Sequence, residues 1–530
     1  MNSRWVACLA FTALMVTAQA LDPRKLLQAP VDTWPTYNGD YSGRRFSTIS
    51  DINQKSIREL GLGWVYRTTT ATGDLGNVVK STPLLVDGVL YFTIPDHVFA
   101  IDARSGHEIW HFHWTSKGGW RLGNRGVGMY GNWLYFETPD CYLVALNSKD
   151  GSERWHKQIC DVNRFYTASV APVIIGNHVI VGVSGDDLDI PGYLESRDPE
   201  TGEVQWHWSS VPKPGEPGSE SWPNAEAMAH GGGMTWVPST YDPELHLLYL
   251  GTGNPQPVTA GKGRKGANLF TESIVALHLD TGRLAWYFQP SPHDTHDWDA
   301  VETPVLFDGE IDGRPRKLLA QASRNGFFFV LDRTSGTNIV TAEFVKTNWA
   351  KGVGASGQPI PNPAKEPRID GALVSPNQGG ATNWPPPSFS PQTELFYVNA
   401  THAFSEYYIF DDSEKPEGWA GNDLGGGGES MLEAIDYRTG KIRWRHKWEG
   451  PGARAGVLST AGHLVFTGDS SNNFIALNAE TGEALWHANV GAAVSNGPMT
   501  YKLDGSQYVV AGAGDALFGF ILRPVQLSSH

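Results

Sequence analysis

Short apolar–polar alternations, each broken by a glycine-centred turn, recur along the chain. The unit consists of an alternating strand, a tight turn and a second strand that usually closes on tryptophan. It occurs at 100–110, 145–155, 195–206, 276–286, 434–444 and 476–486, with a degenerate copy at 330–340. Period-two alternation around a glycine turn predicts a β-hairpin in each copy. A second hairpin pattern precedes several copies, giving four-stranded units of about 45 residues, the size of a propeller blade.

The number of copies and the two chain ends together predict the architecture. Seven copies are visible, whereas "LGLGWVYRT" near the N-terminus and "SQYVVAGAG" and "ALFGFIL" near the C-terminus have no partner in this scheme. Pairing both ends in an eighth sheet removes an exposed edge. The sequence therefore predicts an all-β fold, an eight-bladed β-propeller whose last blade is closed by both chain termini. A string of separate small β domains is the alternative, which the regular repeat disfavours.

Two long gaps between copies, near 207–275 and 341–433, are rich in glycine, proline and tryptophan. We expect them to be loops on one face, where binding sites are usually built. Hydrophobic residues make up 40% of the chain and charged residues 18%, as in folded globular proteins. The net charge of -15 argues against a nucleic-acid partner and is compatible with cations or a basic protein.

The N-terminal segment predicts export. Arg4 precedes the apolar run 5–16, and an A-x-A pattern ends at Ala20. This pattern is typical of a secretory signal at 1–20, which leaves one domain at 21–530 in the periplasm, without a membrane span. An uncleaved anchor is the alternative. Cys141 and Cys160 lie on neighbouring predicted strands and form either a disulfide or two buried thiols. The chain lacks a C-x-x-C-H haem-attachment motif.

The segment "SPHDTHDWDA" at 291–300 concentrates charge in one connection. A solvated loop and a metal site are both compatible with this pattern. His293 and His296 resemble zinc ligands out of context, but we expect them to be hydrogen-bonding loop residues, with a substrate-facing role for His296 as a lesser alternative.

Several further motifs occur in a characteristic order. They are "WPTYNGDYSGRRFS", "STPLLVDGVLYF", "GNRGVGMYG", "HGGGMTW", "YLGTGNPQP", "PHDTHDWD", "SRNGFFFVLDR" and "GGATNWPPPSFSP". Together they closely resemble the quinoprotein alcohol dehydrogenases, eight-bladed propellers that use pyrroloquinoline quinone (PQQ). The resemblance extends from about Trp34 to about Leu522.

The resemblance implies a set of cofactor-binding residues. PQQ is a flat quinone with three carboxylates, so it needs an aromatic floor and cationic or hydroxyl donors. Trp236 matches the floor, and Arg125 matches an arginine that binds a carboxylate. The remaining cofactor positions that the resemblance implies are Ser169, Ser184, Gly185, Asn383 and Arg324.

The resemblance also implies a metal site of oxygen ligands, as a hard cation requires. Asp187 stands where many relatives carry glutamate, Asn254 would add an amide oxygen, and Asp297 would be both ligand and catalytic base. Asp299 matches a second aspartate that lanthanide-dependent methanol dehydrogenases carry and calcium enzymes usually lack. Asp187, Asp297 and Asp299 would bring three negative charges, so the predicted ion is a lanthanide(III) or Ca²⁺.

The implied activity is the oxidation of an alcohol to an aldehyde or ketone by hydride transfer to PQQ. The metal ion would act as the Lewis acid, Asp297 as the base and Arg324 as a positive hydrogen-bond donor. A small alcohol is the implied substrate, and a separate cytochrome c or similar protein the electron acceptor.

The chain departs from the family around the cofactor. Gly119-Trp120 replaces an adjacent cysteine pair, and Lys80 stands where relatives often carry a glutamate that contacts PQQ. Substrate preference therefore does not carry over. A PQQ-dependent sugar or polyol dehydrogenase and a non-enzymatic periplasmic scaffold remain as alternatives. A scaffold would need the repeats but not Trp236, Asn254, Asp297 and Arg324 together.

Overall fold

The computed structural model describes residues 21–72, 77–185, 189–410, 418–450 and 455–522. The predicted signal at 1–20 and the predicted ligand Asp187 lie outside these ranges. In the part of the chain that is described, no helix combines the length and apolar character needed to cross a membrane.

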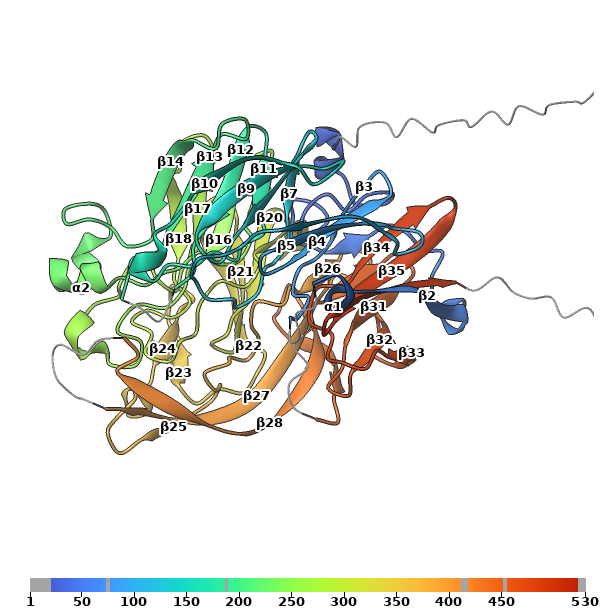
Figure 1. The fold of residues 1–530 in the computed structure, drawn as a ribbon. Helices are drawn as coiled ribbons and strands as arrows, with labels where there is room; N and C mark the ends of the chain where they lie inside the picture. The colour runs from blue at the N-terminus through green and yellow to red at the C-terminus, as the bar shows by residue number, and fades with distance from the viewer. Residues whose placement is uncertain (1–20, 73–76, 186–188, 411–417, 451–454, 523–530) are drawn as a thin grey trace, which may run out of the picture.

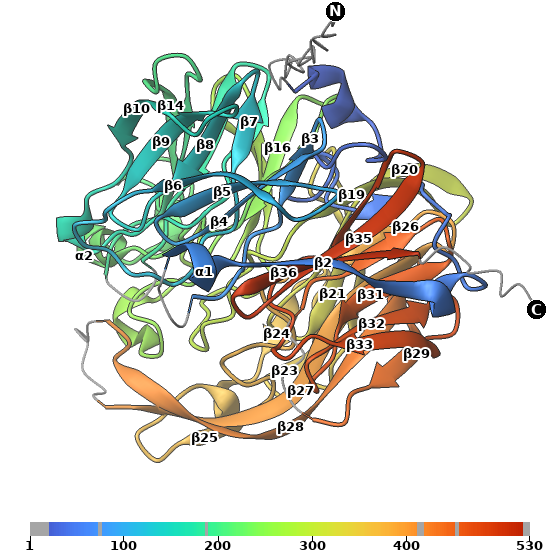
Figure 2. The ribbon, with the colours of Figure 1, turned by 45° about the vertical axis from the view of Figure 1, so that its right-hand side comes forward.

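Antiparallel sheets built from consecutive strands dominate the molecule (Figures 1 and 2). The first three sheets are β3 (Leu84–Val86), β4 (Val89–Ile94), β5 (His97–Asp102) and β6 (Glu108–His113); β7 (Gly128–Tyr130), β8 (Trp133–Glu137), β9 (Tyr142–Asn147) and β10 (Glu153–Gln158); and β11 (Val173–Ile175), β12 (His178–Gly182), β13 (Tyr193–Arg197) and β14 (Val204–Ser209). The next two are β15 (Thr240–Asp242), β16 (Leu247–Gly251), β17 (Ile274–His278) and β18 (Leu284–Phe288); and β19 (Val305–Ile311), β20 (Arg314–Ala322), β21 (Phe327–Asp332) and β22 (Asn338–Glu343).

The later sheets recruit strands from elsewhere in the chain. One contains β25 (Ala372–Val374), β26 (Ser388–Ser390), β27 (Leu395–Ile409), β28 (Gly421–Asp436) and β29 (Ile442–Lys447). Another contains β30 (Leu458–Thr460), β31 (Leu464–Gly468), β32 (Asn473–Asn478) and β33 (Ala484–Asn489), with β1 (Phe46–Ser47) added in parallel to β30. The last contains β34 (Met499–Leu503), β35 (Ser506–Ala513) and β36 (Ala516–Leu522), and β2 (Leu60–Arg67) pairs antiparallel with β36. The fold is a β-propeller.

A repeated contact joins most of the sheets to the next one. The tryptophan that closes a repeat donates from Nε1 to a carbonyl of the following repeat, as Trp206 does to Leu279 (2.6 Å) and Trp286 to Arg333 (3.1 Å). The same bond occurs in Trp64–Ala103, Trp110–Ser148, Trp155–Glu200, Trp444–Ala479 and Trp486–Leu60. Every predicted hairpin copy forms the last two strands of its sheet.

The turn glycine of each repeat leaves room for this tryptophan. Gly282 has φ +65°, and a Cβ there would lie 2.5 Å from the Trp206 ring. The degenerate copy at 330–340 lacks the tryptophan, and the glycine that follows it in the next repeat, Gly440, faces Ala342 instead. This copy keeps its turn glycine although it lacks the tryptophan ring, and it still folds as the hairpin of β21 and β22.

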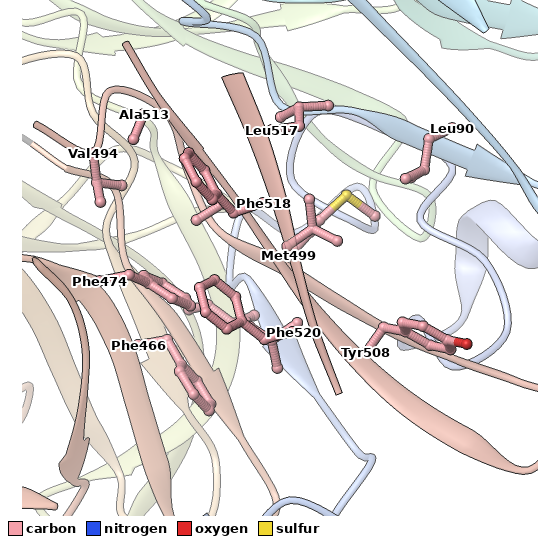
Figure 3. Close-up of a cluster of buried hydrophobic side chains, with 14 of the residues drawn as sticks. Leu90, Phe466, Phe474, Val494, Met499, Tyr508, Ala513, Leu517, Phe518 and Phe520 are labelled. Atoms are coloured by element: carbon pink, nitrogen blue, oxygen red, sulfur yellow. The ribbon is translucent and has the colours of Figure 1, made fainter. Parts of the chain in front are cut away.

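One core cluster spans the sheets at the two chain ends (Figure 3). Leu90 of β4, Phe466 of β31 and Phe474 of β32 belong to it. The strands β34 to β36 contribute Met499, Tyr508, Ala513, Leu517, Phe518 and Phe520. Apolar burial therefore joins segments from the beginning and the end of the chain.

The long gaps contain more regular structure than the sequence predicts. The gap at 207–275 holds α2 (Ala225–His230), β15 and β16; α1 (Thr68–Thr72) follows β2. In the gap at 341–433, β23 (Ala350–Val353) pairs with β24 (Pro359–Pro361), and β27 pairs with β28 from Leu395–Asp436 to Ile409–Gly421. Figures 1 and 2 show β27 and β28 as a long curved arm along one side of the molecule.

Cys141 and Cys160 form a disulfide. Cys141 lies directly before β9 and Cys160 shortly after β10, two strands that pair antiparallel. The hairpin therefore brings the two cysteines together, which decides between the two alternatives that the sequence leaves open.

Candidate active site

A cavity of about 430 Å³ collects most of the predicted site residues. Trp236 precedes β15, Asp297 and Asp299 lie between β18 and β19, and Arg324 lies between β20 and β21. Loops of neighbouring sheets therefore build the cavity together. The predicted residues in its wall are Arg125, Ser169, Ser184, Gly185, Trp236, Asp297, Asp299, Arg324 and Asn383.

Two aspartates flank one buried arginine. Arg324 Nη2 lies 3.0 Å from Asp297 Oδ2, and Arg324 Nη1 lies 3.1 Å from Asp299 Oδ2. Burial acts to lower the pKa of the guanidinium, but the two carboxylates outweigh it and raise that pKa above its ordinary value. Arg324 is therefore a permanent cation here, in a setting where desolvation strengthens its attraction to negative charge.

Trp236 connects this charged group to the other end of the site. Its Nε1 donates to Asp299 Oδ2 at 2.9 Å, and the Arg125 guanidinium carbon lies 4.6 Å from its ring centroid. Arg125 also lies 5.1 Å from the Trp384 ring centroid. The two indoles and the guanidinium form one cation–π group, of which Arg125 and Trp236 line the cavity. Trp384 therefore contacts Arg125, a predicted cofactor residue.

Hydroxyl groups extend the Arg125 end of the cavity. Arg125 Nη1 donates to Ser169 Oγ at 2.7 Å, and Ser169 Oγ lies 3.2 Å from Ser184 Oγ. Lys80 lines the same cavity and donates to the carbonyl of Leu122. Burial, and then the nearby Arg125, lower the pKa of Lys80. Two cationic groups and two hydroxyls match the needs of a ligand with several carboxylates.

Asn254 fits the predicted role of a metal ligand. It is fully buried, and its amide oxygen receives no hydrogen bond from any described residue. An unpaired buried acceptor costs free energy unless a ligand satisfies it. Its backbone N–H donates to Asp299 Oδ1 at 2.7 Å, which places Asn254 beside the aspartate pair. The donor set of amide and carboxylate oxygens is that of a hard cation.

Asp299 has a structural role that the sequence does not reveal. Its two oxygens accept hydrogen bonds from Asn254 and Trp236, and Oδ2 also forms an ion pair with Arg324. It therefore fixes the aromatic floor relative to the arginine before any ion binds. Metal coordination by Asp299 remains a prediction, and it would have to share these oxygens.

The charged loop at 291–300 is buried, so its interpretation as a solvated loop is wrong. It has no regular secondary structure, and Asp297 adopts φ +62°. His296 Nε2 lies 3.0 Å from the carbonyl of Lys365 and its ring stacks on Trp298. His293 Nδ1 lies 2.9 Å from the carbonyl of Gly266. Both histidines are thus loop hydrogen-bonders, and neither is in the cavity wall described above.

Glycines 231–233, before Trp236, have positive φ angles. A Cβ at Gly231 would meet Pro191 at 2.5 Å, and one at Gly232 would meet the carbonyl of Asn254 at 2.2 Å. They make room for neighbouring backbone, including that of the predicted ligand Asn254.

Other wall residues were not predicted. Gln378 donates to Asp297 Oδ2, and Trp419 and Asp423 reach the cavity from the region around β28. Trp120, which replaces the family's cysteine pair, also lines it. Polar residues in irregular connections carry no periodic signal, so only the fold reveals them.

Two fully buried glutamates lie near this group. Neither the Glu272 nor the Glu302 carboxylate receives a hydrogen bond from the described residues. Burial raises the pKa of each well above its ordinary value; nearby carboxylates, Asp294 foremost, add to this at Glu272, whereas Arg324 opposes it at Glu302. Burial therefore favours the protonated form of both side chains.

A larger cavity of about 760 Å³ lies elsewhere. Its wall is mostly apolar and includes Leu21, Leu26, Met129 and Ile174. Lacking the arginine and aspartate groups of the smaller cavity, it does not fit a ligand with three carboxylates.

Comparison with known proteins decides the family. Residues 34–370 and 430–509 match the PQQ family of glucose, ethanol and alcohol dehydrogenase β-propeller domains. A quinohemoprotein alcohol dehydrogenase of Comamonas testosteroni is 35% identical, covering 93% of this chain and 74% of the relative. The chain belongs to the PQQ-dependent alcohol dehydrogenase family. It is accordingly an oxidoreductase that acts on the CH–OH group of alcohols.

Other members of the PQQ-dependent alcohol dehydrogenase family agree in sequence and fold. The quinoprotein alcohol dehydrogenase PedH of Pseudomonas putida is 35% identical over 90% of this chain and 85% of its own. The solved structure of quinohemoprotein alcohol dehydrogenase ADHIIG from Pseudomonas putida has a TM-score of 0.88 at 31% identity, covering 95% of this chain and 82% of that one. A europium-containing methanol dehydrogenase has a TM-score of 0.84 at 27% identity, covering 93% and 98%. PQQ and a metal ion are the cofactors of this family's active site.

Proposed function

We propose that this protein is a periplasmic quinoprotein that oxidises an alcohol to the aldehyde or ketone, with Asp297 as the catalytic base. The observation that carries the proposal is the joining of Asp297, Arg324, Asp299, Trp236 and Arg125 by consecutive contacts around one cavity. These residues supply a base, a cation, an aromatic face and a carboxylate-binding group in a single site.

Each residue has a role that follows from its contacts. Arg125, Ser169, Ser184 and Lys80 would bind the carboxylates of PQQ, with Trp236 against its ring and Gly185 and Asn383 in the surrounding wall. When bound, PQQ supplies the hydride acceptor and the metal ion supplies a Lewis acid. Arg324 and Gln378 hold Asp297 Oδ2, which orients the Asp297 carboxylate that would accept the substrate's hydroxyl proton.

For the metal, we propose a lanthanide(III) ion, with Ca²⁺ as the alternative, bound by Asn254, Asp297, Asp299 and Asp187. Three carboxylates balance a trivalent ion better than a divalent one. The europium-containing methanol dehydrogenase among the structural relatives supports this assignment. Asp187 enters on sequence resemblance alone.

We also propose that the sheets form eight blades of one closed ring. The pairing of β2 with β36 and the bond from Trp486 to Leu60 support closure by both chain ends. A periplasmic location is supported by the N-terminal signal pattern and by the Cys141–Cys160 disulfide, since disulfides persist in oxidising compartments. A separate cytochrome c is the proposed electron acceptor; a butanol dehydrogenase relative is named with this acceptor.

The test is reconstitution of the apo-protein with PQQ plus either Ca²⁺ or La³⁺, followed by a dye-linked screen of alcohols and sugars. We expect alcohol oxidation that needs both cofactors and is abolished in Asp297→Asn, which keeps the side chain's size but removes the base. Turnover of sugars alone would assign a sugar or polyol dehydrogenase instead. A wild type that gains nothing from La³⁺ would exclude the lanthanide.

A further inference from the structure

The arm formed by β27 and β28 brings to the cavity a carboxylate that the proposed chemistry does not use. Asp423 of β28 lines the same cavity as Asp297 and Asp299. Trp120, Leu122 and Trp419 are part of that wall as well. The cavity therefore holds an acidic group and an apolar surface in addition to the groups assigned to PQQ and the metal.

The strand register directs Asp423 toward the catalytic loop. Asp423 pairs directly with Tyr407 of β27, so the two side chains lie on the same face of the arm. Tyr407 is fully buried, and its hydroxyl donates to the carbonyl of His296 at 3.1 Å, one residue before Asp297. Ser405, on the same face of β27, donates to Asp423 Oδ2 at 2.6 Å. The carboxylate is thus held in position beside the loop that carries the base.

Among the described residues, none carries a positive charge that pairs with Asp423. Within the described ranges, no lysine, arginine or histidine forms an ion pair with it, whereas Asp297 and Asp299 share Arg324. An ionised carboxylate has about four acceptor positions, and Ser405 provides one donor. Asp423 is only partly buried, so the remaining positions are open to a ligand in the cavity.

We propose that Asp423 selects alcohols that carry a protonated amine at the end remote from the reacting hydroxyl. The ammonium group would form a charge-assisted hydrogen bond with Asp423, and Trp120, Leu122 and Trp419 would contact the methylene chain. This rests on the proposed function. The alcohol loses a hydride from its carbinol carbon to the quinone and a proton from its hydroxyl to Asp297, and the product is an aminoaldehyde whose amine stays protonated.

The test compares straight-chain 1-alkanols with ω-amino alcohols of the same chain length in the holoenzyme. We expect the wild type to favour the amino alcohol by about tenfold in kcat/KM, the effect of one charge-assisted contact. Asp423→Asn should remove this preference through a higher KM for the amino alcohol, with kcat and both parameters for 1-alkanols unchanged. Asp423→Glu, which restores the charge, should recover part of the preference.

Glu406→Gln is the matched control. Glu406 is exposed and adjacent to Ser405 and Tyr407 on β27, so its side chain points to the opposite face of the arm. Glu406→Gln therefore removes one negative charge from the arm without changing the cavity wall. This variant should keep the wild-type preference for amino alcohols.

Equal kcat/KM for both substrate classes in the wild type would overturn the proposal, and so would a preference for diols over amino alcohols. An Asp423→Asn defect of equal size for both classes would also overturn it, because that result indicates a structural role. If the wild type oxidises 1-alkanols without an Asp423-dependent preference, only this inference fails. If it oxidises no alcohol with PQQ and metal, the proposed function itself fails.

Discussion

Asp299 contributes more than charge to the site. Trp236 and Asn254 donate hydrogen bonds to its two oxygens, and Arg324 forms an ion pair with it. An aspartate chosen only for metal binding would not need these three partners. Substitution of Asp299 therefore affects the aromatic floor and the arginine as well as any ion.

Asp299→Ala should abolish La³⁺-supported activity and leave a measurable part of Ca²⁺-supported activity, because the lost charge matters most for a trivalent ion. Activation curves for both metals in wild type and variant provide the measurement. If both activities fall by the same factor, with a lower Tm, Asp299 acts only through its contacts to Trp236 and Arg324.

Arg125→Ala should weaken PQQ binding by about 2 kcal/mol or more, the cost of losing a buried charge-assisted contact. Titration of the apo-protein with PQQ gives the affinity. Arg154→Ala is the control, because Arg154 lies 4.3 Å from the Trp133 ring centroid in a similar cation–π pair outside the cavity wall. Equal PQQ affinity in both variants would contradict the assignment of Arg125.

Glu137 should make stability depend on pH. Burial raises its pKa to about 8 from the ordinary 4.5. Below pH 4.5 both folded and unfolded chains carry this proton, so its contribution is fully present. Between pH 4.5 and about 8 the unfolded chain loses the proton first, and stability falls by up to about 1.4 kcal/mol per pH unit. Urea denaturation across this range should show a shallower fall in Glu137→Gln; parallel curves would contradict the prediction.

At the scale of the elements, the contact between a tryptophan of one sheet and a turn glycine of the next recurs between the sheets. Gly282 combines a positive φ with a close tryptophan, whereas Gly313 has φ +71° and no atom within 4 Å of its Cβ position. Substitution of Gly313 therefore tests the effect of backbone strain alone, whereas substitution of Gly282 tests strain together with a steric clash.

Gly282→Ala should lower the free energy of unfolding by about 2–4 kcal/mol, from strain plus displacement of Trp206. Gly313→Ala should cost about 1 kcal/mol, from strain alone. Denaturant unfolding of both variants gives the comparison. Equal losses would show that the ring contact at Gly282 adds nothing.

The sequence predicts the elements that repeat and misses those that do not. The hairpin at 276–286 is recognisable because alternation, turn glycine and tryptophan coincide, and it forms β17 and β18. The arm is missed because the four glycines at 425–428 are typical of a loop, yet they lie within β28. In the site, Arg125 and Asp297 stand in recognisable motifs, whereas Gln378 and Asp423 reach the cavity only through the path of the folded chain.

At the scale of the whole molecule, one sheet contains strands from both ends of the described chain. The strand β36 pairs with β2 from Leu60–Leu522 to Arg67–Ala516, and Met499 and Tyr501 of the same sheet are fully buried. Strand pairing and the core cluster of Figure 3 therefore both join residues from the two ends of the described chain.

Deletion from Ser506 onward, which removes β35 and β36, should abolish cooperative folding of the entire protein, because β2 and the core cluster of Figure 3 lose their partners. Removal of 523–530 alone is the control and should leave the Tm within a few degrees. Calorimetry distinguishes the two. A soluble truncated protein with an unchanged Tm would show that the C-terminal strands are dispensable.

The pairing of β2 with β36 also determines the order of events during biosynthesis. The ribosome makes β2 (Leu60–Arg67) before its partner β36 (Ala516–Leu522). Until β36 has been made, β2 therefore lacks this strand partner, and an unpaired strand edge is a hazard for aggregation.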